Sequence, residues 1–428
     1  MDIRTRFDYD KIPYGKEFTV RLRIEMEGKT TGRGLRKPLN VGIVLDRSGS
    51  MAGMKLRNVK EAAKHFIGRL ADEDTVSLSA FDDEILTIAG PTPAGKATFL
   101  RDRIDGIESG GQTFLSGGYR QGCESVSERM DSECISRVIL LTDGLANVGV
   151  CNPEALAEMA SAMRMKGIST TTIGVGSDYD EMILGRMSEK GGGNAYFIEK
   201  PSDAVEVFAE EVGYLTSLAA TDCTVKLQPA KHDVAHAQLN SYAVLDDGSW
   251  LVGDLYAGQK RSIIVEMKIP AIRASGIAEL GRVRVTYQDA HEKEKSPRTE
   301  YQSINIEVVP KAVFEKAKPD AGVLCESSLL IMAQAKSEAM KLADRGRFDE
   351  ASALLENVAE TIEKLSLVDS QVRVFIQELR ELARRIRTDK DVYYTAHNRK
   401  RMYHDSSMIL RDQRASYLSM IDRRNRGN

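Results

Sequence analysis

Residues 41–51 read Val-Gly-Ile-Val-Leu-Asp-Arg-Ser-Gly-Ser-Met. The first five are mostly apolar or β-branched, which is typical of a buried parallel strand. Asp46, Ser48 and Ser50 then follow at alternate positions, before a helical segment begins near Ala52. In an extended or tightly turned segment, this spacing lets a carboxylate and two hydroxyls converge at the carboxyl edge of a sheet, where open α/β sheets bind ligands. Hard oxygen ligands of this kind suit Mg²⁺, Mn²⁺ or Ca²⁺ and not zinc.

A second apolar run, residues 138–143, also ends in an acidic residue, Asp143, which Gly144 follows. Between the two runs lies a glycine-rich segment, residues 110–113, which ends in Thr113. The spacing of Asp46 and the two serines has an ordinary explanation when taken alone, because Ser and Asp also close strands and cap helices. The three segments together favour a ligand site.

The three segments, in this order, resemble the von Willebrand factor type A (VWA) domain and its metal-ion-dependent adhesion site, over roughly residues 38–217. The resemblance implies a metal site built from five residues: Asp46, Ser48, Ser50, Thr113 and Asp143. It implies that the hydroxyls bind the metal directly, and that the two aspartates act mainly through bound waters. Mg²⁺ is the expected ion, with Mn²⁺ or Ca²⁺ as alternatives, and one coordination position is left for an acidic residue of a partner. The sequence departs from the family pattern at Gln112, because family members commonly have a glycine before the threonine.

Residues 38–217 alternate buried strands with amphipathic helices, which predicts an α/β fold with a doubly wound, mainly parallel sheet. Residues 14–26 alternate apolar and polar side chains and have no place in such a sheet, so we expect them to pair with strands far along the chain. Period-two segments recur at 224–227, 241–245, 250–255, 261–269, 282–287 and 303–309. They predict an antiparallel β-sandwich into which the VWA domain is inserted.

After Pro310 the apolar residues recur at three- and four-residue steps, which predicts helices at 327–344, 348–365, 369–387 and about 394–424. The turn at 344–351 resembles a tetratricopeptide-repeat junction, but a single unit favours a plain helical hairpin. The expected domains are therefore N-terminal sandwich strands (1–37), a VWA domain (38–217), a β-sandwich (218–310) and an α-helical C-terminal region (311–428).

Charge is distributed unevenly along the chain. Residues 371–428 contain 14 Lys or Arg against 7 Asp or Glu, although the whole chain has a formal net charge of −3. A basic segment of this kind is either the solvated face of a helix or a binding surface. As a binding surface it would meet an acidic protein, an anionic membrane surface or nucleic acid, and nucleic acid is the least expected of the three. No apolar run is long enough to span a bilayer, and the first ten residues do not read as a secretory signal. The five scattered cysteines fit reduced thiols in a cytoplasm.

Two further pairs of residues lie near the expected metal edge. Asp82 and Asp83 follow a predicted strand, where they are read as solvated turn acids or, alternatively, as acids at the rim of the metal site. Asn147 and Asn152 lie on the loop after Asp143, and we consider them as residues that shape a partner surface.

The leading functional hypothesis is a non-enzymatic cytoplasmic adaptor that binds an Asp or Glu of a partner through Mg²⁺. The resemblance points to a bacterial intracellular member, and such proteins often look like adaptors for AAA ATPases of the MoxR type or for kinase and phosphatase systems. The alternative is a non-catalytic subunit of an AAA ATPase, of MoxR or chelatase type, or of another enzyme complex. Intrinsic catalysis is disfavoured because the chain shows no Walker lysine motif, His-Glu-x-x-His or Gly-x-Ser-x-Gly. Extracellular adhesion is disfavoured by the missing signal sequence and the unpaired cysteines.

Overall fold

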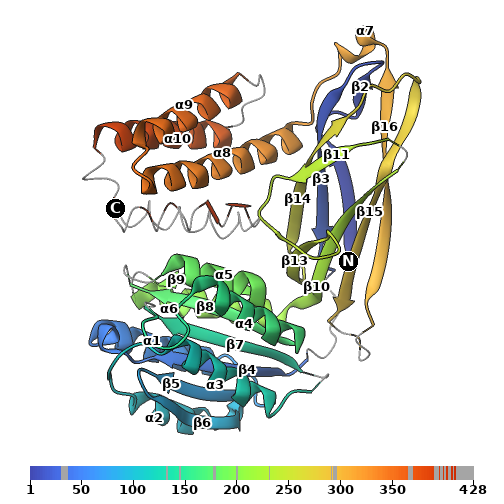
Figure 1. The fold of residues 1–428 in the computed structure, drawn as a ribbon. Coiled ribbons are helices and arrows are strands. Elements are labelled where there is room, and N and C mark those ends of the chain that lie inside the picture. The colour runs from blue at the N-terminus through green and yellow to red at the C-terminus, as the bar shows by residue number, and fades with distance from the viewer. Residues whose placement is uncertain are drawn as a thin grey trace.

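The computed structural model describes residues 1–29, 37–131, 134–143, 146–176, 180–198, 201–230, 232–290, 292, 296–364 and 370–389, together with residues 395, 399, 402, 406, 407, 409 and 410. These residues form an α/β domain, a β-sandwich and a helical region, which appear in Figure 1 at the bottom, right and upper left. The predicted fold class is confirmed.

The α/β domain is built on a six-stranded sheet of order β6-β5-β4-β7-β8-β9. All neighbouring strands pair in parallel except β5 and β6, which are antiparallel. The strands are β4 (Leu39–Asp46), β5 (Thr75–Phe81), β6 (Ile85–Pro93), β7 (Ile135–Thr142), β8 (Ile168–Val175) and β9 (Gly192–Ile198). The helices are α1 (Met54–Ile67), α2 (Ala97–Asp105), α3 (Leu115–Ser127), α4 (Pro153–Met165), α5 (Glu181–Gly191) and α6 (Pro201–Thr216).

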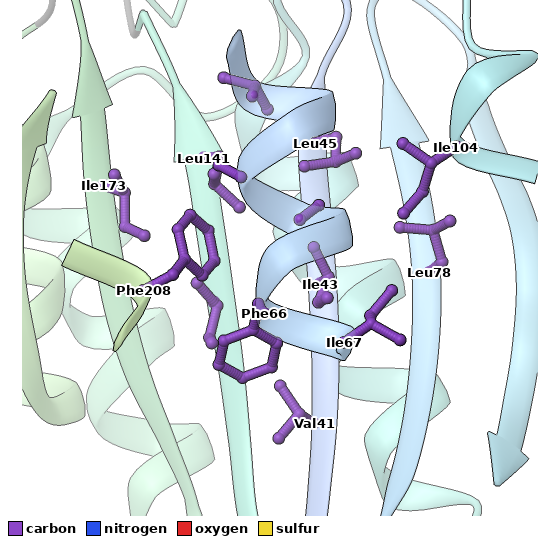
Figure 2. Close-up of a cluster of buried hydrophobic side chains, with 14 of the residues drawn as sticks. Val41, Ile43, Leu45, Phe66, Ile67, Leu78, Ile104, Leu141, Ile173 and Phe208 are labelled. Carbon is purple, nitrogen blue, oxygen red and sulfur yellow. The ribbon is translucent and has the colours of Figure 1, made fainter. Parts of the chain in front are cut away.

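Helices cover both faces of this sheet. Val41, Ile43 and Leu45 of β4 face α1, whose Phe66 meets Phe208 of α6 at a ring-centroid distance of 5.4 Å (Figure 2). On the other face, Val44 packs in the core formed with α3, α4 and α5. Because strand side chains alternate between faces, a strand buried on both sides reads as a continuous apolar run.

Glycines let α3 approach the sheet closely. A Cβ added at Gly118 would lie 2.4 Å from the ring of Phe81, and one added at Gly122 would lie 2.3 Å from a methyl group of Val44. Both contacts are far inside van der Waals distance, so no larger residue fits without displacing the helix. The close packing fixes α3, whose first turn follows Thr113 directly.

The sandwich consists of two mainly antiparallel sheets, of order β1-β3-β14-β11 and β12-β13-β10-β15-β16-β2, with one shared apolar core. Its N-terminal strands are β1 (Asp2–Phe7), β2 (Lys11–Pro13) and β3 (Phe18–Glu27). The remaining strands are β10 (Leu218–Pro229), β11 (Ala235–Gln238), β12 (Ala243–Val244), β13 (Trp250–Tyr256), β14 (Lys260–Ile269), β15 (Gly276–Asp289) and β16 (Arg298–Val309). β3 pairs with β14 along ten residues, so the expected pairing of the N-terminal strand with late strands is confirmed.

A buried ion network joins the sandwich to the α/β domain. Arg137, near the start of β7, is fully buried and donates to Glu211 of α6 and Asp254 of β13, both at 2.8 Å. Burial alone would raise the pKa of Glu211, but the ion pair with Arg137 and hydrogen bonds from Thr171 and Asn194 hold it below its ordinary value. The joint lies at the amino edge of the parallel sheet, opposite the carboxyl edge.

The helical region contains α7 (Lys311–Phe314), α8 (Ala321–Asp344), α9 (Phe348–Glu363) and α10 (Ser370–Thr388). α8 and α9 form a hairpin whose turn contains Gly346 at a φ of 75°, a conformation that favours glycine. Gln334 of α8 donates to the carbonyl oxygen of Leu239 at 2.7 Å, which attaches the hairpin to the sandwich. The helix expected at about 394–424 lies almost entirely outside the described residues. In the described part of the chain, the helices are too short or too polar to cross a membrane.

Replacing Arg137 with Met should lower the free energy of unfolding by about 3–5 kcal/mol, because Glu211 and Asp254 would stay buried without their cation. The measurement is urea unfolding followed by circular dichroism. Arg4→Met is the control, since Arg4 is exposed and its pair with Glu25 spans 3.8 Å, so this change should cost less than about 1 kcal/mol. Equal unfolding midpoints for the two variants would show that the network does not stabilise the joint.

Candidate metal-binding site

The segment after β4 folds into a compact loop that gathers oxygen atoms. Asp46 ends the strand, and its Oδ1 accepts from the backbone N–H of Ser48 at 2.8 Å. The loop then tightens into a short 3₁₀ turn at Gly49–Met51. As a result the hydroxyl oxygens of Ser48 and Ser50 lie 3.1 Å apart. The alternate spacing seen in the sequence therefore does bring these side chains together.

Asp143 joins this cluster from the neighbouring strand. β4 and β7 are paired in parallel, with Leu45 opposite Leu141, so both strands end at the same edge of the sheet. Ser50 Oγ donates to Asp143 Oδ1 at 2.8 Å, and Lys55 Nζ donates to Asp143 Oδ2 at 2.7 Å. Four oxygen-bearing side chains and one ammonium group thus form a continuous polar cluster.

Asp46 is the most enclosed member of the cluster. Its side chain is fully buried, and Thr142 Oγ1 donates to its Oδ2 at 2.5 Å. Burial nevertheless raises the pKa of Asp46 to about 6, despite the hydrogen bonds from Thr142 and Ser48. The carboxylate is therefore under-compensated, which is the electrostatic condition that a bound cation would relieve.

Thr113 is held beside the cluster by backbone hydrogen bonds. The N–H of Gly49 donates to the carbonyl of Gly111, and the N–H of Gly110 donates to the carbonyl of Arg47, both at 2.8 Å. The N–H of Thr113 donates to Asn147 Oδ1 at 2.8 Å. The glycine-rich loop is thus fixed between the loops that follow β4 and β7, and all five predicted site residues lie on three directly connected loops.

Asp82 has a role that its sequence position does not reveal. It is 3% exposed and accepts from the N–H groups of Gly111 and Glu84, both at 2.9 Å, and from Arg47 Nη2 at 3.0 Å. Although burial opposes the shift, these donors hold the pKa of Asp82 below its ordinary value. The reading of Asp82 as a solvated turn acid is therefore wrong, because its carboxylate anchors the glycine-rich loop.

Asp83 anchors the same loop from its exposed side. Its Oδ1 accepts from the N–H of Gln112 at 3.2 Å, so the departure at Gln112 is accommodated through the backbone. A Cβ added at Gly111 would lie 1.7 Å from Asp83 Oδ1, and one at Gly110 would lie 1.8 Å from Asp82 Oδ2. The two consecutive glycines were the sequence signal for this close approach.

The two asparagines after Asp143 are used within the chain. Asn147 holds the backbone of Thr113, and Asn152 caps α4 by accepting from the N–H groups of Glu154 and Ala155 at 3.0 and 3.1 Å. Pro153 occupies the first helical position, where proline is favoured because its missing N–H needs no partner there. Both residues are exposed, and their hydrogen bonds fix the backbone at this edge of the sheet.

The chemistry of the cluster fits a hard divalent cation. It offers two carboxylates and hydroxyls on residues 48, 50 and 113, and Mg²⁺ prefers a small number of carboxylates and other oxygen ligands in octahedral geometry. Within the described ranges, no three His, Cys, Asp or Glu side chains gather into a metal cluster, so a cation at this edge would need the hydroxyls as ligands as well. The ammonium of Lys55 shows that the cluster accepts positive charge.

Comparison with known proteins agrees with this architecture. Residues 40–210 match the family model described as "von Willebrand factor type A domain". Two solved structures share the fold over most of the chain. A VWA protein from Catenulispora acidiphila has a TM-score of 0.65 at 16% identity, covering 89% of this chain and 96% of that one. The ArnB paralog VWA2 from Sulfolobus acidocaldarius has a TM-score of 0.60 at 17% identity, covering 96% and 97%.

Among curated sequences, an uncharacterised protein of Synechocystis, sll0103, is 24% identical over 79% of this chain and 82% of its own length. Other curated relatives are longer, and the matches span 48% of two of them and 25% of a third. Bacterial proteins are thus among the relatives. The family match covers the six-stranded sheet in the first half of the chain, and it shows that this protein carries a von Willebrand factor type A domain at residues 40–210.

Proposed function

We propose that this protein is an interaction module whose VWA domain binds Mg²⁺ and, through it, a carboxylate of a protein partner. The cation would be held by Asp46, Ser48, Ser50, Thr113 and Asp143. The observation that carries the proposal is the hydrogen-bonded chain from Ser48 through Ser50 to Asp143 at the carboxyl edge of the sheet. VWA domains are a family of protein-interaction modules, and a bound cation would supply the electrophile for an acidic side chain.

The surface around the cluster supports binding of a protein. Three exposed apolar side chains, Met54, Val150 and Met182, lie on segments that follow β4, β7 and β8, and therefore on the same edge as the cluster. Protein interfaces commonly combine an apolar area with a few charged anchors. The sandwich joins the opposite edge of the sheet through Arg137, so this joint does not cover the edge where the cluster lies.

The hydrogen bonds that Asp46 and Asp143 accept also favour a binding function over catalysis. Asp46 accepts from Thr142 and Ser48, and Asp143 accepts from Ser50 and Lys55. A general base needs a lone pair directed at a substrate proton, and these oxygens are directed into the cluster. That the protein is not an enzyme, and that its partner belongs to an AAA ATPase or a kinase and phosphatase system, remain predictions.

Replacing Thr113 with Val should weaken Mg²⁺ binding at least tenfold, because the change removes one oxygen ligand and keeps the shape of the side chain. Isothermal titration calorimetry gives the affinity, and circular dichroism in EDTA checks the fold. Thr92→Val serves as the control, because the hydroxyl of Thr92 donates to the carbonyl oxygen of Gly90 on the edge strand β6. Unchanged Mg²⁺ affinity in the Thr113 variant would contradict the ligand set.

Partner binding should require both the cation and an intact site. Affinity capture from a bacterial lysate, with cross-linking and mass spectrometry, compares wild type in Mg²⁺, wild type in EDTA and Thr113→Val in Mg²⁺. We expect a partner cross-linked to the carboxyl edge in the first condition only. The same proteins captured in all three conditions would place recognition on the sandwich or the helical region instead.

The raised pKa of Asp46 predicts a pH dependence in the absence of metal. The folded state keeps the proton of Asp46 up to about pH 6, whereas the unfolded chain releases it near 3.8, so ionisation destabilises the fold as pH rises through this window. In EDTA, the unfolding free energy of wild type relative to Asp46→Asn should therefore fall by on the order of 2–3 kcal/mol between about pH 4 and pH 7. A difference that does not change with pH would show that the burial of Asp46 carries no such cost.

A further inference from the structure

Lys55 lies inside the polar cluster, although lysine is not a metal ligand in such sites. Its Nζ donates to Asp143 Oδ2 at 2.7 Å, and Asp143 is 3% exposed. The other oxygen of that carboxylate, Oδ1, accepts from Ser50, which is one of the proposed ligands. The ammonium therefore neutralises one of the two carboxylates that a divalent cation would use.

The backbone around Lys55 is shaped to keep the side chain in this place. Lys55 is the second residue of α1, and Gly53, which precedes the helix, has a φ of 78° that favours glycine. A Cβ added at Gly176, at the end of β8, would lie 2.8 Å from Lys55 Cε, so the aliphatic part of the lysine runs against a bare backbone. The Lys55 side chain is only about a quarter exposed, unlike a lysine that extends into solvent.

We propose that Lys55 acts as an internal counter-cation of the metal site. Without a divalent cation, Lys55 pairs with Asp143. When the cation and an acidic partner bind, Lys55 pairs with the carboxylate of that partner. This inference rests on the proposed metal-dependent function and adds its regulation. A fixed positive charge near a divalent cation weakens cation binding by electrostatic repulsion. The same charge attracts a carboxylate, so an acidic ligand at the cation should relieve the repulsion.

Cation and acidic partner should therefore bind cooperatively. By linkage, a carboxylate that binds more tightly to the loaded site must raise the affinity of the site for the cation by the same factor. Without a partner the site would bind Mg²⁺ weakly, and the Asp143–Lys55 pair would compete with it. When a carboxylate of the binding partner is present, Lys55 would form an ion pair with it. This ion pair would offset the free energy lost when Lys55 releases Asp143.

The test measures Mn²⁺ affinity by electron paramagnetic resonance for wild type, Lys55→Met and Lys55→Arg, each with and without 20 mM acetate as the carboxylate probe. Lys55→Met should bind Mn²⁺ about tenfold more tightly than wild type, and acetate should tighten Mn²⁺ binding in wild type more than in this variant. Lys55→Arg keeps the charge and should bind Mn²⁺ nearly as weakly as wild type. Lys60→Met is the matched control, because Lys60 lies on the same helix and donates to the carbonyl oxygen of Asp105, outside the cluster.

Thermal unfolding provides a second readout. Lys55→Met should unfold at a lower temperature than wild type in EDTA, because Asp143 loses its counter-charge, and saturating Mg²⁺ should raise its midpoint more than that of wild type. Weaker or equal Mn²⁺ binding in Lys55→Met would overturn the inference and make Lys55 a positioning residue for Asp143. If wild type and all variants bound no Mn²⁺, the proposed function itself would fail, so the two failures are distinguishable.

Discussion

The candidate site depends on the parallel pairing of β4 with β7. The register sets Leu45 opposite Leu141, so Asp46 lies next to Thr142. The loops after both strands therefore begin at the same level of the carboxyl edge. Parallel pairing requires a crossover, and the crossover through α1 and the crossover through α3 both begin at this edge. The polar loops are thereby concentrated where the apolar strands end. A shift of one residue in this pairing would separate Ser50 from Asp143.

Charge is balanced in different ways at the two ends of β7. At the amino edge, Arg137 is fully buried between two carboxylates and makes a permanent joint with the sandwich. At the carboxyl edge, Asp143 pairs with Lys55, whose side chain is partly exposed, and Asp46 accepts hydrogen bonds from Thr142 and Ser48. A buried, fully paired charge fixes the orientation of two domains, whereas an incompletely compensated cluster can exchange its counter-charge. β7 therefore connects the buried Arg137 network to the cluster whose counter-charge we propose to be exchangeable.

Much of this arrangement could be predicted from the sequence, because the relevant signals are local. Apolar runs at 41–45 and 138–141 gave the central strands, and the spacing of Asp46, Ser48 and Ser50 gave the loop. Asp82 could not be recognised, because its burial depends on the loop at 110–112, nearly thirty residues away. Arg137 was missed for a similar reason, since a charged residue before an apolar run reads as the end of a strand until Glu211 and Asp254 enclose it. The proposed role of Lys55 could not be predicted from the sequence, because lysine is not a metal ligand in such sites.

We propose that the five oxygen-bearing residues form one metal site. Crystals of the wild-type protein soaked in Mn²⁺ and measured at the manganese absorption edge would test it directly. We expect an anomalous peak enclosed by Asp46, Ser48, Ser50, Thr113 and Asp143, with Lys55 Nζ displaced from Asp143. Manganese bound elsewhere, with the hydrogen bonds among these side chains unchanged, would contradict it.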